Sequence, residues 1–253
     1  MSSKWVNVVV LLAVSATGMG AQADMVGVYS LTDDKQKDAG TMTIQYRDEQ
    51  RVRYDFNGRK ADESGALLLL NDKLYAITPQ GEVMDMALVA GIAGALGATH
   101  VKPKAQPTFS LDATGKKESV AGVTGEVYTW GDGAHSGEVV LSKDPRAKQL
   151  SQAMERVGDH MQQSMGNSQV SSTFREMRDH PVLRDKGIVR SQEASGSSMR
   201  LEEITESPLA DALFVLPKKV NATALPGMPN GIPNMNDPQI QMLMKELMKS
   251  QGH

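Results

Sequence analysis

The chain has no cysteine among its 253 residues. Disulfides, thiolate metal sites and thiol catalysis are therefore excluded, and stability must come from packing. Aromatic residues make up only 4% of the chain, whereas there are 16 methionines, whose flexible side chains fill irregular apolar space. The formal net charge is only −3, so there is no strong basic field to recruit nucleic acid or an anionic membrane.

The sequence motifs of common catalytic sites are also missing. There is no P-loop, no G-x-S-x-G, no H-E-x-x-H and no dinucleotide-binding glycine pattern. The five histidines are scattered along the chain, and adjacent acidic pairs such as Glu202-Glu203 would point to opposite faces of a strand. We therefore expect no catalytic residue, no metal site and no cofactor, and hence a protein that is not an enzyme. A triad assembled only by folding stays open.

The first 23 residues follow the order of a cleavable secretory signal. Lys4 precedes an apolar run over residues 5–16, and small residues follow up to Ala21-Gln22-Ala23. The apolar run is shorter than the roughly 20 residues that a membrane-spanning helix needs. We predict export to a bacterial periplasm, cleavage after Ala23 and at most transient contact with the membrane; a retained N-terminal anchor is the alternative.

Short segments with alternating apolar and polar residues predict antiparallel strands. Residues 41–47 and 51–56 alternate in this way and are joined by a short polar link, which predicts a hairpin. A second hairpin is predicted around Asn71-Asp72, since these residues tolerate the positive φ of a two-residue turn. The two strands of this second hairpin are residues 67–70 and 73–77. The other predicted strands cover residues 109–111, 118–130, 138–141, 188–194 and 199–204, the last two as a hairpin.

Three segments before the C-terminal tail are predicted to be helical. Residues 84–98 are rich in alanine and glycine, and we interpret them as a helix buried against the sheet or as a mobile or membrane-touching lid. The best helix covers residues 145–165, with Asp144 as its cap and Pro145 in its first turn. A short helix over 170–180 would end at Pro181. The apolar stripe of the long helix consists of Leu150, Met154, Val157, Met161 and Met165.

Composition divides the chain into four parts. After the signal at residues 1–23, residues 24–220 read as one domain, and residues 221–235 as a proline-rich linker. Residues 236–253 predict a methionine-rich amphipathic tail helix that could dock on a protein partner. Its apolar face consists of Ile240, Leu243, Met244 and Leu247.

Three stretches resemble a poorly characterised family of secreted bacterial proteins with the half-barrel fold of the lipoprotein-carrier (LolA/LolB-like) superfamily. They are residues 117–128 (KESVAGVTGEVY), 137–142 (GEVVLS) and 207–217 (SPLADALFVLP). The chain departs from the family pattern in two places, lacking a cysteine at residues 124–126 and a tryptophan in the strand at 138–141. The resemblance implies an antiparallel sheet curled over helices, with an apolar concavity, and does not transfer a ligand.

We therefore expect an α+β fold, in which a curved antiparallel sheet (an incomplete barrel) has its concave face covered by helices 84–98 and 145–165. A concave apolar sheet suits a small hydrophobic molecule or an acyl chain. The preferred hypothesis is a periplasmic, non-enzymatic protein that binds a hydrophobic ligand, a lipid or a lipid-modified partner. The predicted groove residues are Ile44, Tyr46, Tyr54, Phe56, Leu88, Ile92, Val127, Met154 and Met161.

Two other functions remain open. The first is an interaction module for another envelope protein, acting through the tail helix. The second is copper handling, because thioether sulfur is a soft ligand that suits Cu(I). The residues that could supply copper ligands are His160, Met161, Met165, Met242, Met244 and Met248. Hydrophobic packing is the competing interpretation of the methionines in the long helix.

Overall fold

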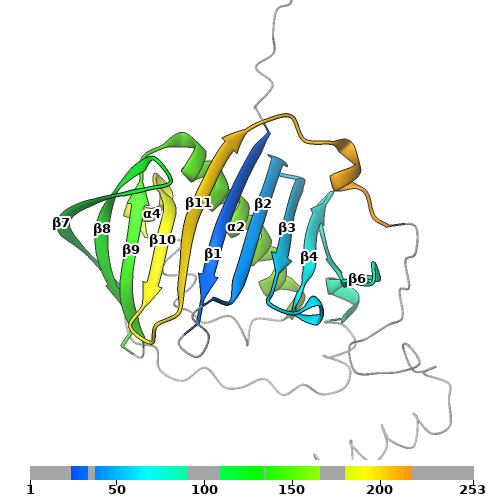
Figure 1. The fold of residues 1–253 in the computed structure, drawn as a ribbon, viewed down its shortest axis with the longest axis horizontal. Helices are drawn as coiled ribbons and strands as arrows, with labels where there is room; N and C mark the ends of the chain where they lie inside the picture. Colours follow the sequence, from blue (N-terminus) through cyan, green and yellow to red (C-terminus); the bar gives the residue numbers. More distant parts are fainter. Residues whose placement is uncertain (1–23, 34–37, 90–108, 134, 166–179, 218–253) are drawn as a thin grey trace, which may run out of the picture.

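The computed structural model describes residues 24–33, 38–89, 109–133, 135–165 and 180–217. They form one antiparallel sheet of eleven strands that does not close into a barrel (Figure 1), in the order β6-β5-β4-β3-β2-β1-β11-β10-β9-β8-β7. The strands are β1 (Met25–Thr32), β2 (Gly40–Asp48), β3 (Arg51–Asn57), β4 (Gly65–Leu70), β5 (Lys73–Ile77), β6 (Val83–Asp85), β7 (Ser110–Val120), β8 (Val123–Gly131), β9 (Ser136–Ser142), β10 (Gly187–Glu193) and β11 (Ser198–Glu206).

The helices of the described chain are few. Those that lie wholly within the described residues are α2 (Pro145–Met165), the single turn α4 (Pro181–Arg184) and the 3-10 turns η1 (Ala61–Glu63) and η2 (Asp211–Phe214). The expected α+β class, an incomplete barrel covered by two helices, is therefore wrong, and the protein is mainly β.

Two segments account for this change of class. Val83–Asp85, the start of the helix predicted over 84–98, pairs with β5 as a sixth strand. Residues 86–89 are helical, and the rest of that predicted helix lies outside the described residues. At the other edge, β7 extends over eleven residues where only a short strand at 109–111 was expected.

The predicted hairpins in the first half of the chain are confirmed. Strand β2 pairs with β3 so that Ile44 lies opposite Tyr54, and β4 pairs with β5. The turn between β4 and β5 has Asn71 at φ 51° and Asp72 at φ 60°, the left-handed conformation that a two-residue hairpin turn requires. The last predicted hairpin is also present, as β10 and β11.

The strand predicted over residues 118–130 is wrong, because the chain reverses inside it. Ala121 and Gly122 have φ values of 49° and 75° and form the turn between β7 and β8. Alanine rarely adopts a positive φ, so the sequence carried only half of the usual turn signal.

The two ends of the described chain meet in the middle of the sheet. Strand β1 pairs with β11, with Met25 opposite Glu206, and β2 flanks β1 on its other side. The first and last strands are therefore central rather than edge strands. Each half of the sheet extends outward from this pair.

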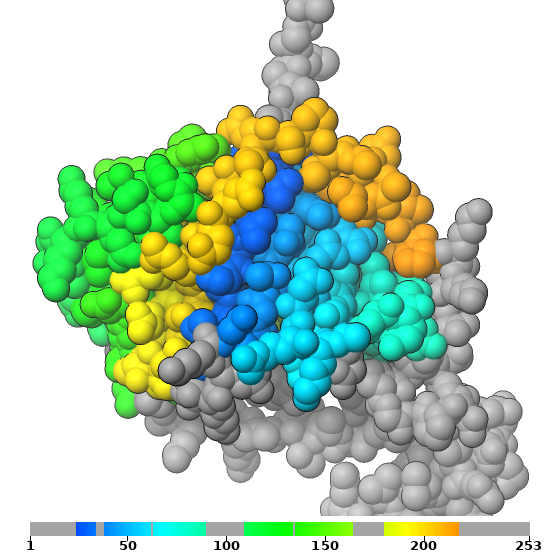
Figure 2. Space-filling model, in the orientation of Figure 1, coloured from blue at the N-terminus to red at the C-terminus, as the bar shows by residue number. Residues whose placement is uncertain are grey.

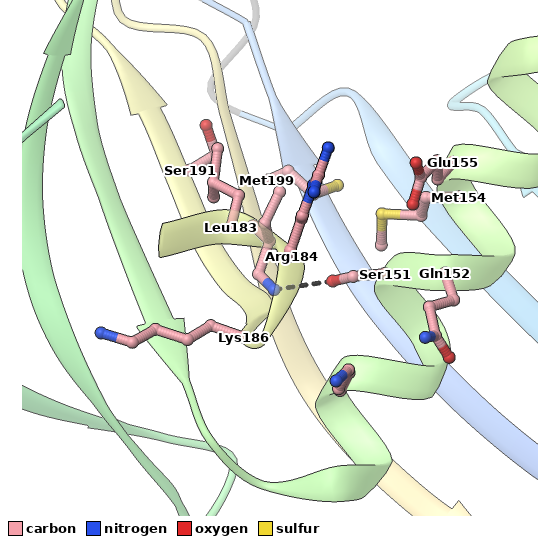
Figure 3. Close-up of a pocket in the computed structure, with 11 residues that line it drawn as sticks. Ser151, Gln152, Met154, Glu155, Leu183, Arg184, Lys186, Ser191 and Met199 are labelled. Carbon is pink, nitrogen blue, oxygen red and sulfur yellow. Dashed lines mark hydrogen bonds between the residues drawn. The ribbon is translucent and has the colours of Figure 1, made fainter. Parts of the chain in front are cut away.

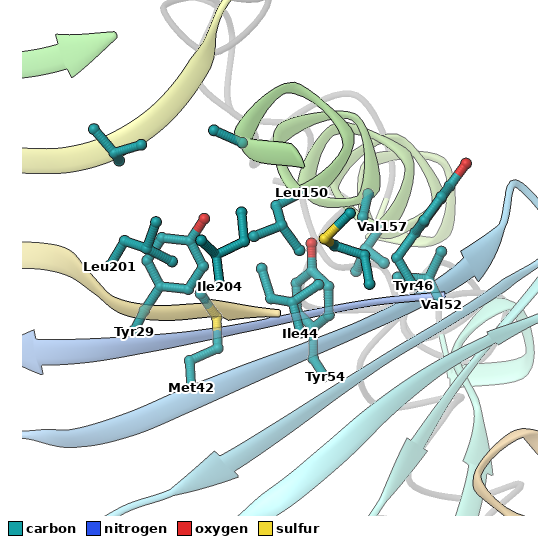
Figure 4. Packing of buried hydrophobic residues seen from close by; sticks show 14 of the residues in the cluster. Tyr29, Met42, Ile44, Tyr46, Val52, Tyr54, Leu150, Val157, Leu201 and Ile204 are labelled. Carbon is teal, nitrogen blue, oxygen red and sulfur yellow. The ribbon is translucent and has the colours of Figure 1, made fainter. Parts of the chain in front are cut away.

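One face of the sheet is covered by α2, which lies behind the sheet in Figure 1 and above the core residues in Figure 4. The helix is capped as predicted, because the Asp144 carboxylate accepts the Arg146 N–H at 2.9 Å. Along its predicted stripe Leu150 and Val157 are buried, and Met154 and Met161 pack partly buried against the same cluster. The buried sheet residues of this cluster include Tyr29, Met42, Ile44, Tyr46, Val52, Tyr54, Leu201 and Ile204.

Two glycines let α2 approach the sheet closely. A Cβ on Gly27 of β1 would lie 2.3 Å from a methyl group of Leu150. A Cβ on Gly187 of β10 would lie 2.1 Å from the carbonyl carbon of Ala147, which belongs to the helix backbone. Both strands therefore contact the helix where a side chain would have separated them.

The opposite face is covered in part by the segment after β11, residues 207–217, which we call the closing strap. Alternation along β4 places Leu67 and Leu69 in the α2 cluster and Ala66 and Leu68 in a second cluster with Phe214 of the strap. Figure 2 shows the strap in orange beside the blue and cyan strands. The leucine-rich strand β4 is therefore buried on both faces.

Arg47, near the end of β2, holds the closing strap to the sheet. Its guanidinium donates to the Asp24 carboxylate, at 3.1 Å for the shortest contact, and also contacts Asp211 and the Leu209 carbonyl oxygen. The centre of the Phe214 ring lies 4.9 Å from the guanidinium carbon. Asp24 in turn accepts the Leu209 N–H at 2.7 Å, so one arginine joins the start of β1 to three positions of the strap.

Replacing Arg47 with methionine should release the closing strap. We expect the melting temperature to fall by about 5 °C, and limited proteolysis to cut within residues 207–217 faster than in the wild type. Arg59→Met, at an exposed position, is the matched control and should change neither quantity. Unchanged proteolysis of the Arg47 variant would show that apolar contacts alone hold the strap.

Replacing Gly187 with alanine should push α2 away from β10. The added methyl group cannot fit 2.1 Å from backbone atoms, so we expect a loss of about 1–3 kcal/mol in the free energy of unfolding, measured by denaturant titration. Gly131→Ala is the matched control, because its nearest neighbour would be 3.6 Å away. Equal stability of the two variants would refute this close approach.

Candidate functional site

A cavity of about 300 Å³ opens between α2, α4 and the strands β10 and β11. Figure 3 shows it with α4 on one side and α2 on the other. Its volume is at the lower end of the range for small-molecule pockets. The lining residues are Lys148, Ser151, Gln152, Met154, Glu155, Leu183, Arg184, Lys186, Ile188, Ser191 and Met199.

The apolar part of the cavity lies at a seam between two hydrophobic clusters. Met154 and Met199 pack against the main cluster beneath α2. Leu183 and Ile188 pack against a separate cluster of Tyr128, Val139 and Leu141. All four lining residues are only partly buried, so each keeps apolar surface that a ligand could cover.

A bulge in β10 is the site of a hydrogen bond between two walls of the cavity. The pairing of β10 with β9 shifts between Ile188 and Arg190, and such a bulge disrupts the hydrogen bonds of the ladder locally. The Ile188 N–H donates instead to the Ser151 hydroxyl of α2 at 2.7 Å, the bond drawn as a dashed line in Figure 3. The helix and strand are thereby fixed at the base of the cavity.

Lys186, just before β10, is committed to the body of the sheet. Its ammonium group contacts the Glu126 carboxylate and the Tyr128 hydroxyl, each at 2.5 Å, and lies 4.7 Å from the centre of the Tyr128 ring. The hydrogen bonds from Lys186 and Tyr128 lower the pKa of Glu126 to about 2. This group therefore fixes the β8–β10 side of the cavity.

The other two basic groups of the lining are more open to solvent. Lys148 pairs with Asp185 at 3.2 Å, but the Asp185 side chain is 86% exposed. Arg184 is exposed at the end of α4, and within the described ranges it forms no ion pair. Glu155 is the one acidic residue of the lining.

The structure brings most of the predicted groove residues together, but as packed core. Ile44, Tyr46, Tyr54 and Val127 are buried, whereas Phe56, Met154 and Met161 pack partly buried against the same cluster. Leu88 is 43% exposed, and Ile92 lies outside the described residues. Met154 is the member of this set that also lines the cavity.

Sequence reasoning did not find the rest of the lining. The sequence predicted a helix over 170–180 that ends at Pro181, and residues 170–179 of it lie outside the described residues. In the structure Pro181 instead begins α4, with His180 as the cap. Proline in a first helical turn is common, so the signal for α4 was present but was given the opposite meaning.

The described residues hold no group of three or more His, Asp or Glu side chains placed to bind a metal. Of the residues considered for copper, His160 and Met161 are in α2. The side chain of Met165 and the tail methionines lie outside the described residues. Within the same limits, no described helix is long and apolar enough to cross a membrane.

Comparison with known proteins finds no match to a family model or to a curated protein. Among solved structures, a crystal structure of MucB in complex with MucA(peri) gives a TM-score of 0.40 and 11% identity, covering 76% of this chain and 54% of that one. The Pseudomonas aeruginosa MucA/MucB complex also gives 0.40, with 10% identity, covering 76% and 56%. A structure of PNGF-II gives 0.35 with 8% identity, covering 76% and 30%.

This chain therefore spans about half the length of the MucB chains it matches. Scores at this level indicate only a distant likeness in the course of the fold. The resemblance to the family of secreted proteins described above stays a prediction.

The ion pair between Glu126 and Lys186 should make the stability of this region depend on pH. Because folding lowers the pKa of Glu126 from 4.5 to about 2, its stabilisation is complete above pH 4.5 and is lost as the pH falls toward 2. Glu126→Gln should cost under about 1 kcal/mol at pH 6, since the carboxylate is half exposed. The difference from wild type in denaturant titrations should shrink at pH 3; a constant difference would contradict the pairing.

Proposed function

We propose that this protein is an exported, non-enzymatic binding protein that holds a hydrophobic ligand, or the lipid part of a lipid-modified partner, in the cavity between α2 and α4. The observation that carries the proposal is the seam between two hydrophobic clusters. Met154 and Met199 pack against one cluster, Leu183 and Ile188 pack against the other, and all four line the cavity between them. Apolar side chains left partly exposed in a concave site favour an apolar occupant.

The proposed place of action is the periplasm. The support is the N-terminal segment, where Lys4, the apolar run over 5–16 and the small residues before Asp24 have the order of a secretory signal. Asp24 begins the described chain and is already bonded to Arg47 and Leu209. Cleavage after Ala23 would therefore leave the strap contacts of Asp24 intact.

Native mass spectrometry of the protein purified from the periplasm, followed by solvent extraction and lipid analysis, tests the proposal. We expect a co-purifying lipid or acyl mass on the wild type. Met199→Trp should reduce the amount of co-purifying lipid, because the larger side chain would occupy the cavity. Leu88→Trp, at an exposed position outside the lining, should leave that amount unchanged. A bare wild-type protein, or equal loading of both variants, would overturn the assignment of the cavity.

The second candidate is an interaction module for another envelope protein. It is favoured by the apolar face of Ile240, Leu243 and Leu247, which follows a linker with three prolines. A bare mass in the experiment above would shift attention to this tail. Pulldown with the full-length chain and with a chain lacking 226–253 would then test it, since equal capture of partners would remove the tail from consideration.

A further inference from the structure

The cavity has charge of predominantly one sign around an apolar floor. Three basic residues line it, Lys148, Arg184 and Lys186, against the single acidic residue Glu155. A purely apolar ligand would gain nothing from these cations. The arrangement instead favours a ligand with an apolar part and an anionic end.

The three cations differ in how far they are committed to partners within the protein. Lys186 is 10% exposed and bonded to Glu126 and Tyr128, so its charge is neutralised within the protein. Lys148 pairs with Asp185, but this pair is solvent-exposed, and such pairs contribute little. Among the described residues the Arg184 side chain has neither a carboxylate partner nor a hydrogen-bond acceptor, and its backbone N–H donates to the His180 carbonyl oxygen.

Arg184 is also the best placed of the three. In Figure 3 its side chain rises from α4 and overlaps Met199 in this view, with Met154 of α2 across the cavity. Arg184 and the apolar side chains Met154 and Met199 therefore line the same cavity. Guanidinium binds carboxylate and phosphate through two parallel hydrogen bonds.

We infer that the cavity takes an anionic amphiphile. The acyl chain lies on Met154, Leu183, Ile188 and Met199, and the carboxylate or phosphate head is bound by Arg184, with Lys148 adding a second positive charge to the lining. This inference rests on the proposed function and adds the charge and position of the head group.

The test uses four probes with the same ten-carbon chain, added to the delipidated full-length protein at concentrations where each probe is dissolved as single molecules. They are decanoate, decyl phosphate, decanol and decyltrimethylammonium, each measured by isothermal titration at pH 7. We expect the two anions to bind about five- to tenfold more tightly than decanol, and the cation to bind least tightly. The preference should decrease as salt is raised, because the head group is near solvent.

Arg184→Gln should remove the preference without removing binding of the chain. The affinity for decanoate should fall by about five- to tenfold, the affinity for decanol should not change, and Arg184→Lys should recover part of the loss. Arg59→Gln is the matched control at an exposed arginine outside the lining. Circular dichroism and the melting temperature verify that each variant is folded.

The outcomes separate the two levels of the proposal. Equal affinity for decanoate and decanol, or tighter binding of the cation, would overturn the anionic head group while leaving the hydrophobic site in place. Binding of no probe would overturn both. Comparison of decanoate with decyl phosphate shows whether a carboxylate or a phosphate is the preferred anion. An unchanged decanoate affinity in Arg184→Gln would remove Arg184 from the site.

Discussion

The close contact between α2 and the sheet is the interaction on which the rest of the structure depends. An open antiparallel sheet can leave one face in water, but the alternating strands here bury apolar side chains toward α2, including Ile44, Tyr54 and Leu201. The chain has no disulfide to hold such a sheet in shape, so packing must do so. Gly27 and Gly187 bring the helix down to the backbone of β1 and β10, on both sides of the central strand β11. The position of the helix then decides which part of this face is filled and which part is left as a cavity.

The second constraint is topological. Because β1 pairs with β11, the chain starts and finishes in the middle of the sheet, and the segment after β11 must leave across the sheet rather than at its edge. The closing strap follows this route, and Arg47 fixes it by contacting Asp24 and Asp211 together. Burial raises the pKa of Asp24, but the hydrogen bonds from Arg47 and the Leu209 N–H outweigh that effect and hold the pKa below its ordinary value. The carboxylate thus stays charged, and the strap stays bonded, through the pH range in which proteins normally work.

Local patterns in the sequence predicted the elements whose causes are local. The hairpins β2–β3 and β4–β5 follow from alternation and from Asn71-Asp72, and α2 follows from its stripe and its Asp144 cap. Elements with non-local causes were missed: Val83–Asp85 is a strand because β5 offers it an edge. The candidate site follows the same division. Alternation identified residues that share one face of the sheet, but it could not show that α2 packs directly against them and leaves no groove there. Apart from the α2 residues, most of the cavity lining comes from α4 and β10, next to the bulge at Ile188.

The cavity is best understood as a consequence of covering one sheet face with two unequal helices. The long helix α2 packs along the main cluster, whereas the single turn α4 covers only the smaller cluster around Tyr128 and Leu141. A turn of four residues is too short to meet α2 along its length, so a gap remains where the two clusters adjoin. The charges divide accordingly: Lys186, at the sheet, is neutralised by Glu126, while Arg184, at the free end of the turn, has no such partner among the described residues. A basic residue at a helix C-terminus is stabilising by itself, so Arg184 can be retained for the fold and still be available to a ligand.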